Sequence, residues 1–484
     1  MILAGFIAQP AFASDDFETY RLKQHQAAQA ASAEFQEYKE KEDRDFASFL
    51  KARWQEFETH QGRVRIKEPK PRQVPAIMPS ARPVSPPLPA PEAAKPVRPS
   101  SPRPLAAPAA PPAKPVGQRF EVMFYGNRVG FDFDEKWTTY RLSKGARAET
   151  MSTFWTMMSG SKYEPTIRTI GEVRRELKLD DWGHVALWRE VVRALQPDRL
   201  SEQNLLLWYF LVKSGYDVRL GYHGSDVHLF VAVKQQVYST KFTTVGGQTY
   251  YAVMATDHGD SIGSFYTYEA NYPNKLSPLD IGSASTGFTK AASMQRNLSF
   301  EYQNKSIRLD VPYDRDLVQY MGTYPQSEFE LYFDTGGSSL LAHGLLTELE
   351  KHTSKMNEEE AVNFLLAFVQ QSFPYKTDDE QFGREKYFFV EESLHYPYND
   401  CEDRSVLFSW LVSRLLGIKV VGLVYPGHMT TAVALKTVKP GYATADYQGN
   451  HLVIADPTYI GATVGMAMPS YEKLKPKRVI DTRF

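Results

Sequence analysis

Residues 399–417 read Asn-Asp-Cys-Glu-Asp-Arg-Ser-Val-Leu-Phe-Ser-Trp-Leu-Val-Ser-Arg-Leu-Leu-Gly, and Cys401 is the only cysteine among 484 residues. The run from Val406 is apolar nearly all round and closes on a glycine, which is typical of a buried helix. Asn399 or Asp400 is a good N-cap, so we expect Cys401 in the first helical turn. The helix dipole favours a thiolate there, whereas the three neighbouring carboxyl groups oppose one.

The residues after this helix predict three strands. Residues 419–425 form a buried apolar run and residues 429–436 alternate, with Pro426-Gly427 as the turn between them. His428 therefore opens the second strand. A third strand over 451–456 ends in Asp456, and if it pairs antiparallel with the second, His428 and Asp456 face each other across the ladder.

Cysteine, histidine and aspartate in this order are the groups of a thiol acyl-transfer site. A thiolate attacks a carbonyl carbon, an imidazole carries the proton, and a carboxylate holds the imidazole in one tautomer. Cys401, His428 and Asp456 are the candidate catalytic residues. Each also has a structural reading, as a buried apolar thiol, a strand-end histidine and a turn-initiating aspartate.

These motifs carry a resemblance to a known family. Asp-Cys-Glu-Asp, a helix, a glycine and two strands joined through Pro-Gly-His resemble the bacterial transglutaminase-like superfamily, whose core is papain-like. The match covers roughly residues 355–470, including Asp456-Pro-Thr-Tyr-Ile-Gly and the stretch Phe368-Val-Gln-Gln-Ser-Phe-Pro-Tyr375. By this resemblance Gln371 is the oxyanion donor, with Gln370 as the fallback.

The resemblance implies an α+β fold with a papain-like core at the C-terminus and a polypeptide or peptide-like substrate. The family includes both cysteine peptidases and acyl transferases. We expect a cysteine peptidase or amidase that needs no cofactor and no metal. A protein-crosslinking transglutaminase and a non-catalytic, polypeptide-binding scaffold remain open. We expect the nearby His395 and His451 to be structural.

Composition narrows the partners and the location. The formal net charge of −1 gives no case for nucleic acid as a partner, and a single cysteine excludes intramolecular disulfides and multi-cysteine metal sites. No apolar stretch reaches the roughly 18–20 residues of a membrane span. Residues 1–14 resemble the end of a signal peptide, with Ala11-Phe12-Ala13 as the cleavage site, although no positive segment precedes it. We therefore expect a periplasmic or cell-surface protein of a bacterium.

Two further segments precede the folded body. Residues 15–62 predict an amphipathic helix with an aromatic stripe from Phe35 to Phe57, which we expect to dock a partner or self-associate. Residues 63–117 predict a linker, since residues 66–117 hold 17 of the 31 prolines. Such a chain is a semi-rigid spacer, suited to a protein tethered at one end.

The body itself predicts three parts. Residues 118–234 contain a hairpin through Gly126-Asn127, helices near 148–160 and 182–196, an apolar helix ending at Gly215, and two strands, the second with His228. This order parallels the catalytic region and predicts a degenerate copy without a cysteine. Residues 235–340 predict a β-rich module, with strands at 316–320 and 328–333 among others. Residues 341–484 are the predicted catalytic domain.

Overall fold

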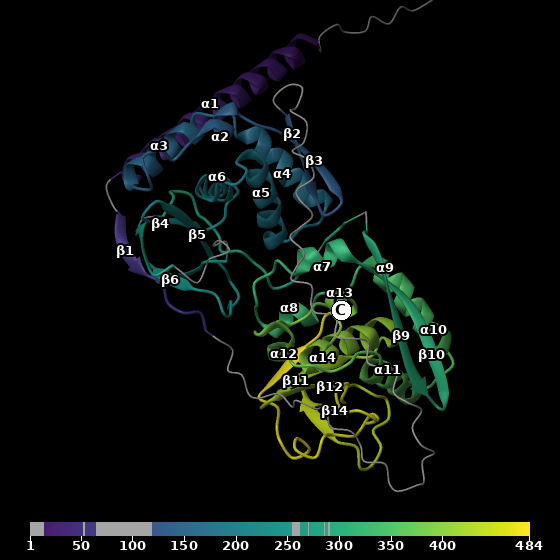
Figure 1. The fold of residues 1–484 in the computed structure, drawn as a ribbon. Coiled ribbons are helices and arrows are strands. Elements are labelled where there is room, and N and C mark those ends of the chain that lie inside the picture. The colour runs from purple at the N-terminus through teal and green to yellow at the C-terminus, as the bar shows by residue number, and fades with distance from the viewer. Residues whose placement is uncertain are drawn as a thin grey trace, which may run out of the picture.

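The structure is a computed structural model that describes residues 14–51, 54–63, 119–253, 262–269, 271–284, 286–288 and 291–484. In these ranges the chain is a mixed α and β fold of two units, each with an antiparallel sheet and a set of helices (Figure 1). The predicted signal segment (1–14) and linker (63–117) lie almost wholly outside the described residues. None of the helices in these ranges has both the length and the apolar character needed to cross a bilayer.

After the N-terminal helix and one strand, the first unit consists of a hairpin, a set of helices and a six-stranded sheet that includes that strand. The hairpin and the helices are β2 (Arg119–Phe124), β3 (Asn127–Asp132), α2 (Glu135–Thr139), α3 (Ala148–Ser159), α4 (Glu164–Glu176), α5 (Asp181–Leu195) and α6 (Leu200–Lys213). The sheet order is β1-β8-β4-β5-β7-β6. Its strands are β1 (Trp54–Glu58), β4 (Val218–His223), β5 (Asp226–Ala232), β6 (Phe242–Val245), β7 (Gln248–Tyr251) and β8 (Ser264–Tyr268). The predicted hairpin and the predicted helices near 148–160 and 182–196 are confirmed.

The second unit repeats this plan. Its hairpin and helices are β9 (Ser293–Tyr302), β10 (Lys305–Asp314), α7 (Arg315–Met321), α8 (Phe329–Phe333), α9 (Ser339–Leu341), the π-helical η2 (Ala342–Leu346), α10 (Thr347–Thr353), α11 (Glu358–Ser372), α12 (Asp378–Phe382), α13 (Val390–His395), α14 (Cys401–Leu411) and the π-helical η3 (Val412–Leu416). The sheet order is β13-β14-β12-β11-β15. Its strands are β11 (Val420–Tyr425), β12 (His428–Val433), β13 (Thr444–Tyr447), β14 (Asn450–Ala455) and β15 (Arg478–Asp481).

The two sheets correspond strand by strand. The order β6-β7-β5-β4-β8 in the first unit matches β13-β14-β12-β11-β15 in the second, and β1 adds one more edge strand to the first. In both units an apolar helix leads into an antiparallel hairpin with a two-residue turn, which pairs His223 with Asp226 in one and Tyr425 with His428 in the other. His428 thus corresponds by position to Asp226, whereas His228 lies two residues further along β5.

The β-rich module expected over residues 235–340 is not a separate unit. Strands β6, β7 and β8 complete the first sheet, and β9 and β10 form the hairpin that opens the second unit. Of the residues expected as strands, 316–320 lie in helix α7, and 328–333 form the N-cap and the whole of helix α8. Short apolar runs do not separate the two states by periodicity, and the Asp314 side chain accepts a hydrogen bond from the Asp316 N–H at the start of α7.

The N-terminal helix is shorter than expected and belongs to the first unit. Helix α1 (Ser14–Leu50) ends before residue 59, and the chain continues into β1, which pairs antiparallel with β8. Phe46 and Leu50 are buried in the core, whereas Phe35 and Tyr38 are exposed. Figure 1 shows α1 lying along the helices of the first unit. The described residues on either side of the predicted linker, in β1 and β2, both belong to the first unit, so α1 is not a separate helix.

Helix α14 is the centre of the second unit. All of its residues are buried, and it packs against α11, α13 and the strands β11 and β12. Gly417 ends the helix with a φ of 65°, a left-handed conformation that glycine adopts without strain. The predicted buried helix and its glycine stop are confirmed. This packing fixes the first turn of α14 against the sheet.

Candidate active site

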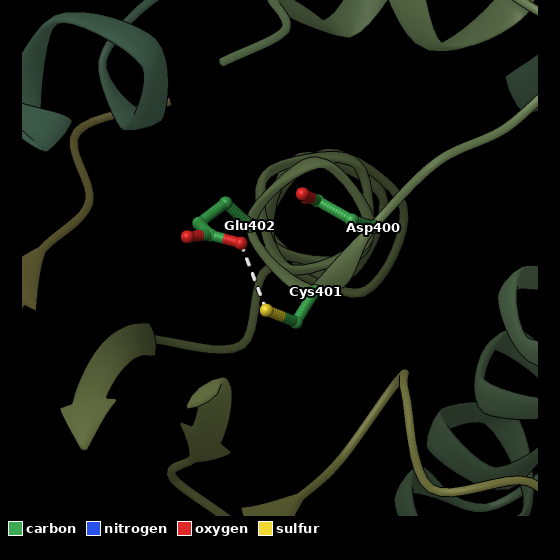
Figure 2. A group of neighbouring side chains, drawn as sticks. All are labelled: Asp400, Cys401 and Glu402. Carbon is green, nitrogen blue, oxygen red and sulfur yellow. Dashed lines mark hydrogen bonds between the residues drawn. The ribbon is translucent and has the colours of Figure 1, made fainter. Parts of the chain in front are cut away.

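Cys401 is the first residue of α14. Asp400 is the N-cap, as the sequence predicted, and its backbone N–H donates to the Asp403 carboxylate at 3.1 Å. The other oxygen of Asp403 accepts from the Phe388 N–H at 3.0 Å. Two segments are thereby bound to the helix start, and this fixes the backbone that carries the thiol. The Cys401 Sγ donates to the Glu402 carboxylate at 2.8 Å, and the ligand atoms of Asp400, Cys401 and Glu402 lie within 4.8 Å of one another (Figure 2).

His428 and Asp456 form a buried pair on the neighbouring strands. Strands β12 and β14 are antiparallel, as predicted, and the His428 Nε2 lies 2.9 Å from the Asp456 Oδ2. Both side chains are almost fully buried. Because the carboxylate accepts from Nε2–H, the neutral ring has its lone pair on Nδ1. Among the described residues Nδ1 has no hydrogen-bond partner.

The Asp456 carboxylate is held from the other side by the loop that follows β14. Its Oδ1 accepts from the backbone N–H groups of Thr458 at 2.8 Å and Tyr459 at 3.1 Å. Gln370, buried on α11, binds the same loop. Its amide nitrogen donates to the carbonyls of Asp456 and Ala462, and its oxygen accepts from the Gly461 N–H. Gln370 is therefore a residue that positions Asp456.

The cysteine helix and the histidine strand are in contact. The Ser405 hydroxyl lies 2.7 Å from the Cys401 carbonyl oxygen and 3.4 Å from that of Met429, the residue after His428. The buried guanidinium of Arg404 interacts electrostatically with both Cys401 and Asp456. The structure thus brings Cys401, His428 and Asp456 into one neighbourhood at the start of α14.

Gln371, the expected oxyanion donor, is not in this neighbourhood. It is exposed, and both atoms of its amide are hydrogen-bonded to the backbone of Glu301 on β9, at 2.9 and 3.1 Å. Successive helical residues point about 100° apart, so adjacent glutamines on α11 face different surroundings. That prediction is wrong, and the fallback Gln370 uses its amide to hold the Asp456 loop.

The site is closed. Cys401 is fully buried, and the Tyr471 ring lies over the His428 imidazole with centroids 4.9 Å apart and planes at 30°. Tyr471 belongs to residues 456–477, which connect β14 to β15 and contain no helix or strand. The Tyr471 ring therefore covers the His428 imidazole, and residues 456–477 are called the covering segment below.

A cluster of buried carboxyl groups lies beside the thiol. Ligand atoms of Asp378, Asp400 and Asp403 lie within 4.8 Å of one another, and carboxylate oxygens suit a hard cation such as Ca²⁺. However, Asp403 accepts from two backbone N–H groups and Asp378 accepts from the Lys386 N–H at 3.0 Å. These bonds explain the cluster as a cap for α14 and its neighbouring loop.

The other histidines nearby have structural partners. His451 is exposed on β14 and lies 2.5 Å from the Asp446 carboxylate on β13. His395 contacts the Tyr313 hydroxyl at 3.3 Å, and burial lowers the pKa of its imidazole. Both were expected to be structural.

The sequence analysis missed three residues of the site: Gln370 in its positioning role, Tyr471 and Arg404. Arg404 had a visible signal, because it is the one basic residue of α14. Tyr471 had none, since it lies in a segment without periodicity. No known protein family matches the chain, and neither curated proteins nor solved structures show a significant match to it.

Proposed function

We propose that this protein is a cysteine-dependent acyl-transfer enzyme of the transglutaminase-like type, acting on amide bonds of a polypeptide. One observation carries the proposal: a buried histidine is held by a carboxylate at Nε2 and keeps its Nδ1 without a partner, next to the helix that begins with Cys401. A purely structural buried imidazole normally has both nitrogens hydrogen-bonded.

The proposed reaction starts when the thiol turns from Glu402 towards His428 and transfers its proton to Nδ1. The thiolate then attacks the amide carbon, and the C–N bond breaks as the imidazolium returns the proton to the departing amine. Water, activated by the same imidazole, hydrolyses the thioester and restores the thiol. With a lysine amine in place of water the product is a crosslink. We favour water because it is always present.

The location also remains a proposal. The Ala11-Phe12-Ala13 motif favours export to the periplasm or cell surface. Cell fractionation with N-terminal sequencing tests this, and we expect the mature chain to begin at Ser14.

The first experiment is the pH dependence of Cys401 alkylation by a small neutral reagent, which reads out the only thiol of the chain. We compare the protein with His428→Ala, and use His451→Ala as the matched control because that histidine is exposed and paired with Asp446. An assembled pair gives an alkylation midpoint well below the ordinary thiol value of about 8.5. His428→Ala is expected to raise the midpoint, and His451→Ala to leave it unchanged.

The opposite result would support the scaffold alternative. A thiol that ionises in the ordinary range and is indifferent to His428 contradicts the enzyme. Should the assembled pair be found, incubating a glutamine-rich polypeptide with and without a primary amine separates hydrolysis from crosslinking.

A further inference from the structure

Arg404 is a buried cation three residues after the nucleophile of the proposed reaction. Its side chain is 1% exposed, and its only hydrogen bond runs from Nη2 to the carbonyl oxygen of Phe373. Its Nε and Nη1 have no hydrogen-bond partner among the described residues, although the carboxylates of Asp400 and Asp456 interact with the guanidinium electrostatically. The guanidinium also lies over the Tyr375 ring, 5.4 Å from the centroid.

Such an arrangement is unfavourable for stability by itself. A buried cation loses its hydration, and the loss is offset only when all of its donors are hydrogen-bonded or a counter-charge is present. Burial lowers the pKa of the Arg404 guanidinium to about 10, so the group still carries its charge at neutral pH. Two donors that are kept unpaired next to a nucleophile are therefore available to a negative charge that forms there during the reaction.

The same region needs a positive charge. Asp400, Glu402 and Asp403 surround the first turn of α14, and each opposes ionisation of the thiol. The expected oxyanion donor Gln371 is bound to β9. The helix start alone would have to stabilise both the thiolate and the oxyanion against three carboxyl groups.

We propose that Arg404 is a positioning residue whose buried charge stabilises the negative charge formed at Cys401, first as the thiolate and then as the tetrahedral oxyanion. This rests on the proposed function and adds the group that offsets the carboxylates. Electrostatic stabilisation by a fixed, desolvated donor is effective because the donor does not reorganise as the charge develops.

Other charged or titratable groups lie on the elements around the start of α14, and the Arg404 substitutions leave them unchanged. They are Asp400, Glu402 and Asp403 on α14, Asp378 on α12, the Lys386–Glu392 pair at α13, Tyr375 after α11, Tyr425 on β11, His428 on β12, and Asp456 and Tyr471 on the covering segment.

The test is a titration of the Cys401 thiolate by its ultraviolet absorbance, taken as the difference between each protein and its Cys401→Ser counterpart. This readout needs no reagent access and so works in the closed site. Arg404→Met is expected to raise the thiolate midpoint by at least about one pH unit, which is about a tenfold loss of thiolate near neutral pH. Arg404→Lys keeps a charge and is expected to retain most of the shift.

Controls separate electrostatics from damage to the fold. Arg219→Met removes a similarly buried arginine of the first unit, bound there to the Tyr268 carbonyl, and is expected to leave the midpoint unchanged. If Arg404→Met does not fold, Arg404→Gln and Arg404→Lys, which differ in charge, replace it. Repeating the substitution in the His428→Ala background shows whether the charge acts on the sulfur directly.

An unchanged midpoint in folded Arg404→Met, or equal midpoints for the Lys and Gln variants, would overturn the proposal. That result is distinguishable from failure of the proposed function. If only the Arg404 proposal fails, His428→Ala still shifts the thiolate midpoint. If the proposed function fails, neither His428→Ala nor Arg404→Met shifts it.

Discussion

The two units share one architecture and differ at the positions where chemistry is proposed. Each central helix is tied to its hairpin by its fifth residue, Asn204 to the Val227 carbonyl in the first unit and Ser405 to that of Met429 in the second. By this match the first residue of α6, Leu200, corresponds to Cys401, and Asp226 corresponds to His428. The first unit keeps the helix and the sheet without a thiol or an imidazole at these two positions.

The comparison shows which constraints belong to the fold and which to the site. Apolar helices and the strand order occur in both units, so they are requirements of packing. The Nδ1 of His428 and two donors of Arg404 have no partner among the described residues, and His228 of the first unit likewise has a Nδ1 without one. In the second unit, however, the Nε2 of the same ring is bound by the Asp456 carboxylate. Buried unsatisfied polar groups of this kind are expected where a site must bind or stabilise something.

The largest effect is expected from moving the thiol between the units. Cys401→Ser should abolish acyl transfer, a loss of several orders of magnitude, followed as new amino groups or ammonia released from an unfolded polypeptide mixture. Adding Leu200→Cys to this variant should restore nothing, because Asp226 stands where an imidazole is required. The thiol at position 200 should be alkylated with an ordinary midpoint of about 8.5. A low midpoint at position 200 would mean that the start of a helix alone is enough to lower the pKa of a thiol.

The second largest effect concerns how α1 belongs to the first unit. The Asp43 carboxylate lies 2.5 Å from the Lys213 Nζ, both side chains are buried, and Asp43 also accepts from Trp155 and Tyr272. Asp43→Ala should destabilise the first unit by about 3–5 kcal/mol, since an unpaired buried ammonium remains. Glu40→Ala, at the exposed pair with Arg44, should change stability by less than about 0.5 kcal/mol. Chemical denaturation measures both changes in stability. Equal effects would support the original expectation of an independent N-terminal helix.

Much of the second unit can be predicted from local sequence patterns. The first unit shows why contacts between distant parts of the chain cannot. The capped helix at Cys401, its stop at Gly417 and the strands carrying His428 and Asp456 follow from local patterns, because each is set by neighbouring residues. The pairing of β1 with β8 joins residues about 200 positions apart, and no local pattern encodes it.

Local sequence patterns also fail to place individual side chains inside the site. Gln370 and Gln371 are adjacent in sequence and read alike, yet one is buried on the Asp456 loop and the other is exposed on β9. Only the rotation of α11 relative to the sheet separates them. The family resemblance could not show that both amides are bound elsewhere, one to the Asp456 loop and the other to β9.

A buried carboxyl group gives the second unit its own pH dependence. Burial raises the pKa of Glu391 to about 7, from an ordinary value of about 4.5. Between these values the folded state holds a proton that the unfolded chain has lost, so stability falls as pH rises towards 7, by up to about 3 kcal/mol. Glu391→Gln should flatten this part of the stability curve, whereas Glu380→Gln, at an exposed position on α12, should not. A slope that persists in Glu391→Gln would assign the dependence to another group.

The adjacent glutamines of α11 provide the next test. Gln370→Ala removes three hydrogen bonds to the loop that holds Asp456, and we expect roughly a hundredfold loss of acyl transfer together with a raised alkylation midpoint. Gln371→Ala should cost less than about threefold, because its amide binds only the Glu301 backbone. A large loss in Gln371→Ala would reinstate it as the oxyanion donor.

The smallest effect is expected at the cover of the second site. The Tyr471 ring lies over His428 and also contacts the Tyr425 ring, with centroids 5.5 Å apart. Tyr471→Ala removes the ring while leaving the triad, so alkylation of Cys401 above its midpoint should become faster by about three- to tenfold, the equivalent of about 1 kcal/mol of ring packing. Tyr266→Ala, at an exposed tyrosine on β8 of the first unit, is the matched control. If the cover acts only on access, the rate rises without a shift of the midpoint. A shifted midpoint with an unchanged maximal rate would instead mean that Tyr471 acts on the charge of His428 and not on access to the thiol.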